Sequence, residues 1–196
     1  MTMTYVFPDM HGRLDHLIGA LGAVGAEGLT EDDTLVFLGD YIDRGPESAQ
    51  LVKELRKLAE ARDKVICLSG NHEYMMLWGL IEGGEALNGW MINGGVQTVE
   101  SYTNGLGEMD QAAMENDAKW FSELPTWHED VHRVYVHAGV SQHHALEVQP
   151  IQALHWLRYE NMDGTGYRGK HVVHGHSPNK LGPVTIGDRT ALDVGA

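Results

Sequence analysis

Two carboxylates and a guanidinium stand together in a glycine-flanked turn early in the chain. The turn follows an apolar stretch at residues 34–38 and carries Asp40, Asp43 and Arg44. Glycine on either side lets the backbone adopt turn conformations that are closed to other residues. The pattern predicts a metal-dependent reaction centre in which Asp40 binds metal while Asp43 and Arg44 act beside it.

Similar polar residues recur after other apolar stretches. Carboxylate, amide and imidazole side chains are ligands of Mn²⁺, Fe and Zn²⁺ in proteins. Those that follow predicted strands are Asp9, His11, Asp40, Asn71, His137 and His176. Asp9 and His11 are two residues apart, so on an extended segment they would point the same way. Two metal ions about 3.5–4 Å apart need a ligand with two donor oxygens between them, and we expect Asp40 to be that ligand.

Each cluster taken alone has an ordinary structural explanation. An isolated Asp-x-His sequence is usually a turn, and Gly-Asn-His is usually a loop, because Asn and Gly tolerate left-handed backbone. Five such clusters in succession, each after a predicted strand, favour a shared metal centre over coincidence.

The elements that must position these residues alternate between strands and helices. Apolar residues at helical spacing cover residues 14–24 and 51–59. The predicted strands are residues 3–7, 34–38, 64–68, 133–136 and 171–173, and a closing hairpin joins residues 184–186 to 190–194. This alternation is typical of an α/β fold with parallel strands and crossover helices, in which ligands bind at the carboxyl ends of the strands. We predict one domain over residues 1–196.

Residues 74–130 do not follow the alternation of strands and helices that the rest of the chain shows. Helical spacing of apolar residues is interrupted by Gly83-Gly84 and Gly94-Gly95, and Pro125 ends the last helical stretch. We interpret this segment as a mostly helical insertion that caps one side of the site. Its methionines and tryptophans are expected to pack in the core.

Composition excludes several classes of function. The formal net charge is −14, which repels phosphate backbones and therefore argues against nucleic-acid or anionic-membrane binding. No apolar run approaches the roughly 20 residues that span a bilayer. The first residues are too short and uncharged for a signal peptide, so a cytoplasmic location is expected. The one cysteine, Cys67, lies in an apolar run and is expected to be a buried hydrophobic residue.

At this point the chain resembles a known family. The segments Asp9-Met10-His11-Gly12, residues 39–45, Gly70-Asn71-His72-Glu73, His137-Ala138-Gly139 and Gly175-His176 are similar to the successive signatures of PPP-type metallophosphatases. The resemblance is strongest to the small bacterial and phage enzymes of the lambda type, and symmetrical diadenosine tetraphosphatases are related. It implies a calcineurin-like metallophosphoesterase fold with central mixed β-sheets, flanking helices and a helical insertion.

The resemblance also implies a role for each residue. One metal is held by Asp9 and His11, and the other by Asn71, His137 and His176, with Asp40 bridging the two. A metal-activated hydroxide attacks phosphorus in line. His72 is the general acid, and Asp43 orients it. Arg44 and Arg158 bind the phosphate oxygens.

The implied cofactors are two divalent metal ions, with Mn²⁺ expected first and Fe or Zn²⁺ as alternatives. The expected substrates are phosphorylated Ser or Thr side chains, with Tyr and small phosphate esters as extensions. The main alternative is a symmetrical dinucleoside polyphosphate hydrolase, which would use the same metal centre.

Two further alternatives carry less weight. A phosphodiesterase or nuclease would show Gly-His-x-His, but Pro178 occupies the place of the second histidine. A metal-binding module without turnover predicts loss of the acid–base pair, yet His72 and Asp43 are both present. Among the neighbouring residues, Glu73 is expected to accept structural hydrogen bonds, and His174 to support or pack against the site.

Overall fold

The computed structural model describes residues 2–160 and 163–196. Its first third repeats strand, loop and helix three times. The strands are β1 (Thr4–Phe7), β2 (Thr34–Phe37) and β3 (Val65–Cys67), and the helices that follow them are α1 (Leu14–Ala26), α2 (Ser48–Ala61) and α3 (Asn71–Glu82). The strands pair in parallel in the order β1-β2-β3, as the alternation predicts.

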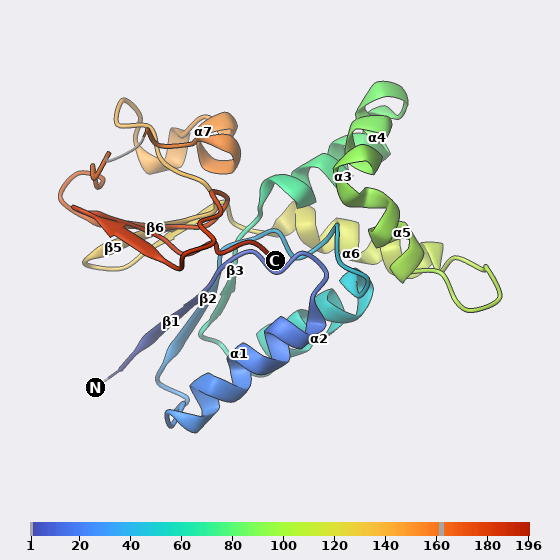
Figure 1. Cartoon of the computed structure of the whole chain (residues 1–196), viewed down its shortest axis with the longest axis horizontal. Coiled ribbons are helices and arrows are strands. Elements are labelled where there is room, and N and C mark those ends of the chain that lie inside the picture. The colour runs from blue at the N-terminus through green and yellow to red at the C-terminus, as the bar shows by residue number, and fades with distance from the viewer. Residues whose placement is uncertain (1, 161–162) are drawn as a thin grey trace.

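A second sheet is built from the last third of the chain (Figure 1). Its strands are β4 (Trp127–Glu129), β5 (Arg133–Val136), β6 (His171–His174), β7 (Val184–Ile186) and β8 (Arg189–Ala191). They follow the order β4-β5-β6-β8-β7, with β5, β6 and β8 parallel and the two outer strands antiparallel. The sheet is therefore mixed, and the predicted hairpin at its edge is confirmed with a shorter second strand.

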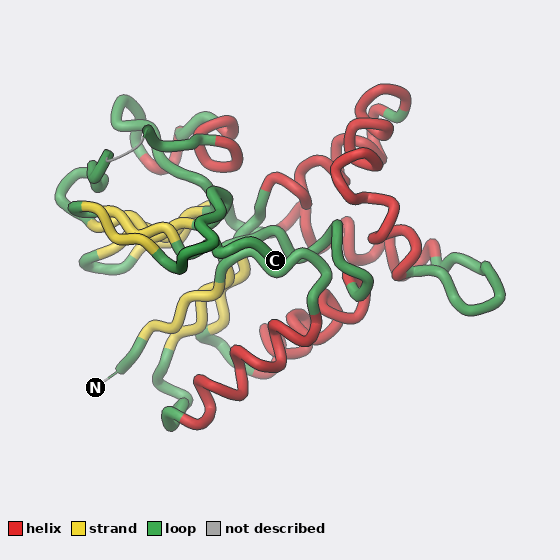
Figure 2. Tube along the Cα trace, viewed as in Figure 1, coloured by secondary structure: helices red, strands yellow, loops and turns green. Residues whose placement is uncertain are grey.

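The two sheets face each other and share a layer of buried side chains. Val36 and Leu68 from the first sheet meet Tyr135 and Val173 from the second. Helices α1 and α2 cover the other face of the first sheet (Figures 1 and 2). The other face of the second sheet packs against the segment that contains η2 (Leu146–Val148) and α7 (Ile151–Trp156). This layering brings the carboxyl ends of both parallel sets to the middle of the molecule.

The segment expected to be a helical cap is mostly helical. After α3 come α4 (Gly84–Trp90), a π-helical turn η1 (Met91–Gly95), α5 (Val96–Ser101) and α6 (Gln111–Glu123). The boundary of the insertion at residue 130 is wrong, because Trp127–Glu129 form β4 and pair with β5. So short a strand carries little pattern of its own and is defined by its partner. None of the helices in the described residues combines the length and apolar character needed to cross a bilayer.

Candidate metal centre

Each predicted cluster lies in the loop that leaves the carboxyl end of a strand. Asp9 and His11 follow β1, Asp40 follows β2, and Asn71 follows β3. In the second sheet, the corresponding residues are His137 after β5 and His176 after β6. Because the sheets pack face to face, these loops meet at one place.

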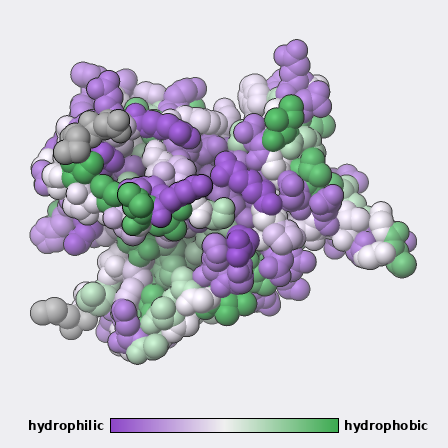
Figure 3. Space-filling view, in the orientation of Figure 1, coloured by the Kyte–Doolittle hydropathy of each residue, from purple (hydrophilic) through white to green (hydrophobic). Residues whose placement is uncertain are grey.

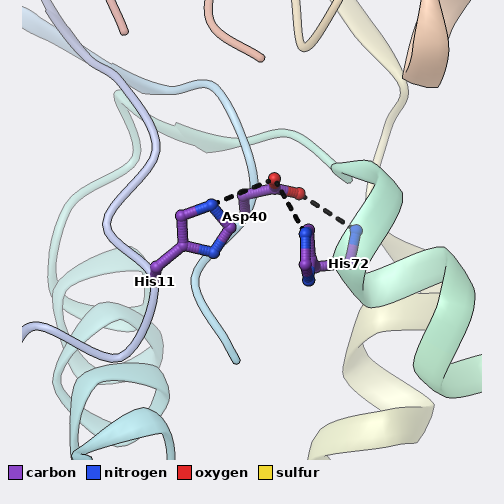
Figure 4. Close-up of side chains that lie close together, drawn as sticks. All are labelled: His11, Asp40 and His72. Carbon is purple, nitrogen blue, oxygen red and sulfur yellow. Dashed lines mark hydrogen bonds and ion pairs between the residues drawn. The ribbon is translucent and has the colours of Figure 1, made fainter. Parts of the chain in front are cut away.

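Asp40 lies at the centre of this meeting point. Its Oδ2 atom is 3.5 Å from Nε2 of His11 and 3.9 Å from Nε2 of His72, while its Oδ1 atom is 3.5 Å from Nε2 of His137. Figure 4 shows the rings of His11 and His72 converging on the carboxylate. One carboxylate therefore presents its two oxygens to two different groups of side chains.

These groups are compact enough to bind metal ions. Candidate ligand atoms of His11, Asp40 and His72 lie within 4.8 Å of one another, and so do those of Asp40, His137 and His176. Asn71 joins the second group, since its Oδ1 atom is 2.8 Å from Nε2 of His137 and 3.0 Å from Nδ1 of His176. Asp40 belongs to both groups, which is the arrangement that a shared ligand requires.

The hydrogen bonds of the histidines leave lone pairs directed at the centre. Nδ1 of His11 donates to the carbonyl of Ile42, and Nδ1 of His137 donates to the carbonyl of Leu38, both at 3.0 Å. In these tautomers Nε2 carries the lone pair. Nε2 of His137 then faces the acceptor Oδ1 of Asn71, so two acceptors lie within contact distance. A cation between such acceptors would turn their repulsion into coordination, so this donor set fits a metal ion.

Asp9 reaches the centre differently from the sequence-based expectation. The segment is not extended at His11, whose φ is 41°, so Asp9 and His11 do not project as neighbours on a strand would. Both oxygens of Asp9 lie near the backbone N–H of His176, at 3.1 and 3.2 Å. Burial and the nearby Asp193 carboxylate raise the pKa of Asp9 to about 8. Among the described residues, Asp9 belongs to neither of the two compact groups.

The site buries carboxylates beside neutral imidazole rings, so a bound cation would stabilise their ionised form. Burial and the neighbouring carboxylates of Asp9 and Glu73 raise the pKa of Asp40 well above its usual value. Burial lowers the pKa of His11 to about 3 and that of His176 to about 4, so these rings stay neutral at neutral pH. Buried carboxylates beside neutral imidazoles are the setting in which divalent cations replace protons.

His72 and Asp43 form a buried pair beside the centre. Nδ1 of His72 donates to Oδ2 of Asp43 at 2.6 Å, which leaves Nε2 facing Asp40. Burial raises the pKa of Asp43 to about 7, and burial followed by the Arg44 charge lowers the pKa of His72 to about 3. The geometry fixes the ring with one nitrogen anchored and the other directed at the candidate metal centre.

Asp43 is held by two residues that sequence reasoning did not identify as functional. Thr98 Oγ1 donates to Oδ1 of Asp43 at 2.6 Å, and Trp90 Nε1 lies 3.0 Å from both carboxylate oxygens. The backbone N–H of Asp43 also donates to Thr98 Oγ1 at 2.8 Å. Trp90 and Thr98 both lie in the segment whose sequence pattern predicts only helices, and that pattern does not indicate which distant residue their side chains contact.

The two arginines occupy different positions. The guanidinium of Arg44 donates to Nε2 of His11 and to Nε2 of His72, each at 2.9 Å, so it lies at the centre. Arg158 is exposed after α7, and its charge acts on His176 and Asp193. The two arginines are far apart in the sequence, but the charges of both act on the candidate ligands.

Backbone strain is concentrated at this site. Among the described residues, those other than glycine with positive φ are His11, Asp40, Asp43, Arg44, Arg168 and His176. All but one belong to the predicted site. Residues in this region of φ/ψ space are held there by their surroundings, and such strain clusters at active sites and ligand-binding positions.

Glu73 supplies part of that restraint. Its carboxylate accepts hydrogen bonds from the backbone N–H groups of Asp40, Tyr41 and Gly70 at 2.8–2.9 Å. A side chain at Gly70 could not be accommodated, because its Cβ would lie 2.2 Å from Oδ1 of Asp40. The expected structural role of Glu73 is confirmed, and it ties the β2 loop to the start of α3.

The profile described as calcineurin-like phosphoesterase matches residues 3–194. A symmetrical bis(5'-nucleosyl)-tetraphosphatase of Yersinia pestis is 36% identical over 74 residues, which are 38% of this chain and 24% of that protein. A zinc-dependent endopolyphosphatase of Saccharomyces cerevisiae is 37% identical over 75 residues, covering 37% of this chain and 22% of the relative. The matched part is thus about a quarter of the length of these relatives.

Solved structures share the fold over almost the whole chain. A protein serine/threonine phosphatase from Saccharomyces cerevisiae superposes with a TM-score of 0.66 and 18% identity, covering 98% of this chain and 70% of the other. At this level of identity the similarity concerns the fold alone. The predicted metallophosphoesterase fold, with mixed sheets and flanking helices, is confirmed.

Proposed function

Since the chain belongs to the calcineurin-like phosphoesterase family, we propose that it hydrolyses phosphate monoesters on Ser, Thr or Tyr side chains, using two divalent cations. The observation that carries this proposal is the position of Asp40, whose two oxygens face two separate groups of ligand atoms. A single-metal site would not need a carboxylate shared in this way.

The ligands divide between the two sides of Asp40. Asp9 and His11 would complete one site, and Asn71, His137 and His176 would complete the other. Bound cations supply charge for the phosphoryl oxygens and lower the pKa of water so that it can act as the nucleophile. The mixed nitrogen and oxygen donors suit Mn²⁺, Fe and Zn²⁺, and we propose Mn²⁺. The zinc dependence in the name of the yeast relative keeps Zn²⁺ as the alternative.

His72 is proposed to protonate the leaving oxygen. Its Nδ1 atom is held by Asp43, so Nε2 points toward the centre with a lone pair while the ring is neutral. The negative charge of a bound phosphate would favour protonation of Nε2, which could then pass that proton to the leaving oxygen. The Asp43 carboxylate stabilises the charged ring and keeps its orientation while Thr98 and Trp90 fix the carboxylate. Protonation matters most for alkoxide leaving groups, which are poor without it.

Arg44 and Arg158 are proposed to bind the phosphate oxygens. Arg44 already reaches the two histidines that flank Asp40, so its guanidinium lies where a bound phosphate would meet it. The planar guanidinium can donate two parallel hydrogen bonds to one phosphate, which a lysine cannot. Arg158 would contribute from the loop after α7.

A second candidate is hydrolysis of dinucleoside polyphosphates, the activity in the name of the Yersinia relative. Trp78 is 49% exposed and stacks on Tyr74, which also contacts Trp156. An exposed aromatic surface near α7 could stack a nucleobase. A metal-binding module without turnover is less well supported, because the His72–Asp43 pair is intact and fully hydrogen-bonded.

Rate measurements on both classes of substrate test the proposal. With Mn²⁺ present, kcat/KM would be measured for a panel of phosphoserine, phosphothreonine and phosphotyrosine peptides and for diadenosine tetraphosphate. We expect kcat/KM to be higher for the best peptide than for the dinucleotide. Faster hydrolysis of the dinucleotide by tenfold or more would establish the second candidate, and no hydrolysis of any of them would reject both.

A further inference from the structure

A shallow, open cleft lies beside Arg44. It has a volume of about 540 Å³ and lies along the turn between α4 and α5. Its walls are formed by Arg44, Met91, Ile92, Asn93, Gly94, Val96 and Gln97. Arg44 thus belongs both to the candidate catalytic centre and to this cleft.

The turn that forms the cleft is fixed to the catalytic pair at both ends. Trp90, just before the turn, and Thr98, just after its last lining residue, both donate hydrogen bonds to the carboxylate of Asp43. Residues 91–97 are therefore a short bridge whose two ends are tied to one carboxylate. A wall held in this way is pre-organised, so binding against it loses little conformational entropy.

The middle of the turn is fixed to Arg44. The backbone N–H of Arg44 donates to the carbonyl of Gly94 at 3.2 Å. Gly94 has a φ of 112°, and a Cβ there would lie 2.6 Å from the Arg44 nitrogen. Only glycine permits this approach, which holds the middle of the turn against the backbone of Arg44.

The lining combines three apolar side chains with the amides of Asn93 and Gln97 and one cation, Arg44. Ile92 is 86% exposed and Val96 is 45% exposed, and Met91 adds a third apolar side chain. No carboxylate and no second cation is found among the lining residues, all of which the structure describes. Figure 3 shows apolar surface where α3, α4 and α5 lie, on a molecule whose visible face is mostly hydrophilic.

We propose that this cleft binds an aliphatic or aromatic side chain next to the phosphorylated residue of a peptide substrate. The inference rests on the proposed function, because it places the phosphate at Arg44. A residue that neighbours the phosphorylated one would then meet Ile92 and Val96. A dinucleoside polyphosphate would instead bring further phosphates, for which the cleft offers no cation besides Arg44.

Two phosphoserine peptides that differ only in the flanking residues test this proposal. One carries Leu on both sides of the phosphoserine and the other carries Ser. The wild-type protein with Mn²⁺ is expected to show a kcat/KM about tenfold higher for the Leu peptide, the gain expected from burying one aliphatic side chain. Ile92→Ser is expected to reduce that ratio to near one while leaving the rate on the Ser peptide unchanged.

A matched control tests whether the effect of Ile92→Ser is specific to the cleft or would follow from making any exposed surface more polar. Leu106 is 85% exposed in the loop between α5 and α6, so Leu106→Ser makes a similar change far from the cleft. This variant should keep the wild-type ratio. Equal rates on the two peptides in the wild type, or a ratio unchanged by Ile92→Ser, would overturn the cleft assignment while leaving the phosphatase activity established. Hydrolysis of diadenosine tetraphosphate without hydrolysis of either peptide would overturn the proposed function itself.

Discussion

Nδ1 of His72 donates a 2.6 Å hydrogen bond to Asp43, and both side chains are almost fully buried. This bond sets which nitrogen of the ring can exchange a proton with a substrate. Because Nε2 is directed toward Asp40, the pair would deliver a proton at the candidate metal centre under the proposed function. The bond also links the catalytic loop after β2 to the first turn of α3, so the fold and the chemistry depend on the same contact.

Replacement of His72 by Asn should affect substrates according to their leaving groups. Loss of a general acid lowers rates by about 10²–10⁴-fold when the leaving oxygen needs a proton. Hydrolysis of a phosphoserine peptide should fall in this range, whereas hydrolysis of p-nitrophenyl phosphate, whose leaving group needs little protonation, should fall far less. The measurement is kcat on both substrates at saturating Mn²⁺. Equal losses on the two would show that His72 does not act as the acid.

Thr98→Val should remove two hydrogen bonds to Asp43 with little change in the shape of the side chain. The hydroxyl of Thr98 bonds both the carboxylate and the backbone N–H of Asp43, so its loss leaves buried polar groups short of partners. We expect unfolding to become easier by about 1–3 kcal/mol and kcat on a phosphoserine peptide to fall at unchanged KM. Thr103→Val is the matched control, since that hydroxyl bonds only the carbonyl of Val99. A kcat equal to wild type in Thr98→Val would remove Thr98 from the catalytic machinery.

Asp33 gives the fold a defined dependence on pH. Its carboxylate accepts hydrogen bonds from the backbone N–H groups of Met3 and Thr30 and from the Thr30 hydroxyl, and these lower its pKa. The stabilisation is present above the unfolded pKa, near 3.9, and is lost as the pH falls through the lower folded value. Denaturant midpoints of wild type and Asp33→Asn should therefore differ at pH 6 and converge below pH 4. A difference that stayed constant from pH 6 to well below pH 4 would contradict the assignment.

The sequence carried enough information to place the loops of the site. Asp9, Asp40, Asn71, His137 and His176 each follow a short apolar strand, and parallel strands bring their carboxyl ends to one edge. Local pattern is sufficient for this inference because it depends only on strand direction. The structure brings Asp40, Asn71, His137 and His176 together, whereas Asp9 lies outside the two compact groups. The conformation at His11 is not the extended one that the spacing suggested.

The hydrogen bonds that Trp90 and Thr98 make to Asp43 could not be predicted from the sequence pattern. Trp90 and Thr98 lie 47 and 55 residues from Asp43, in a segment whose own pattern indicates only amphipathic helices. Which polar residue of a helix faces a distant loop depends on how the helices pack, and packing leaves no periodic signal. Asp193, which influences the pKa of Asp9 from the end of the chain, was missed for the same reason.

Removal of divalent cations should destabilise the protein. The carboxylates of Asp9 and Asp40 are both buried. After burial, Asp9 and Glu73 raise the pKa of Asp40, and Asp193 and Glu73 raise the pKa of Asp9. Cations at a hundredfold excess over their Kd would stabilise the folded state by about 2.7 kcal/mol, so a chelator should lower the unfolding temperature by about 5–10 °C. Thermal unfolding is followed with chelator, then with Mn²⁺ or Zn²⁺ restored. An unfolding temperature that does not respond to any of these ions would argue against a built metal centre.

Asp40→Asn should release both metal ions together. Asn keeps the size of the side chain but has one donor oxygen, so it cannot serve two cations at once. Because Oδ1 faces His137 and Oδ2 faces His11, the group at His137 keeps no carboxylate and the group at His11 keeps only that of Asp9. Metal analysis by mass spectrometry should give about two ions per chain in wild type and a loss from both sites in the variant. Asp15→Asn, which changes a surface carboxylate paired with Arg13, should retain the wild-type content. Retention of both ions in Asp40→Asn would refute a bridging carboxylate, and loss of a single ion would assign Asp40 to one site only.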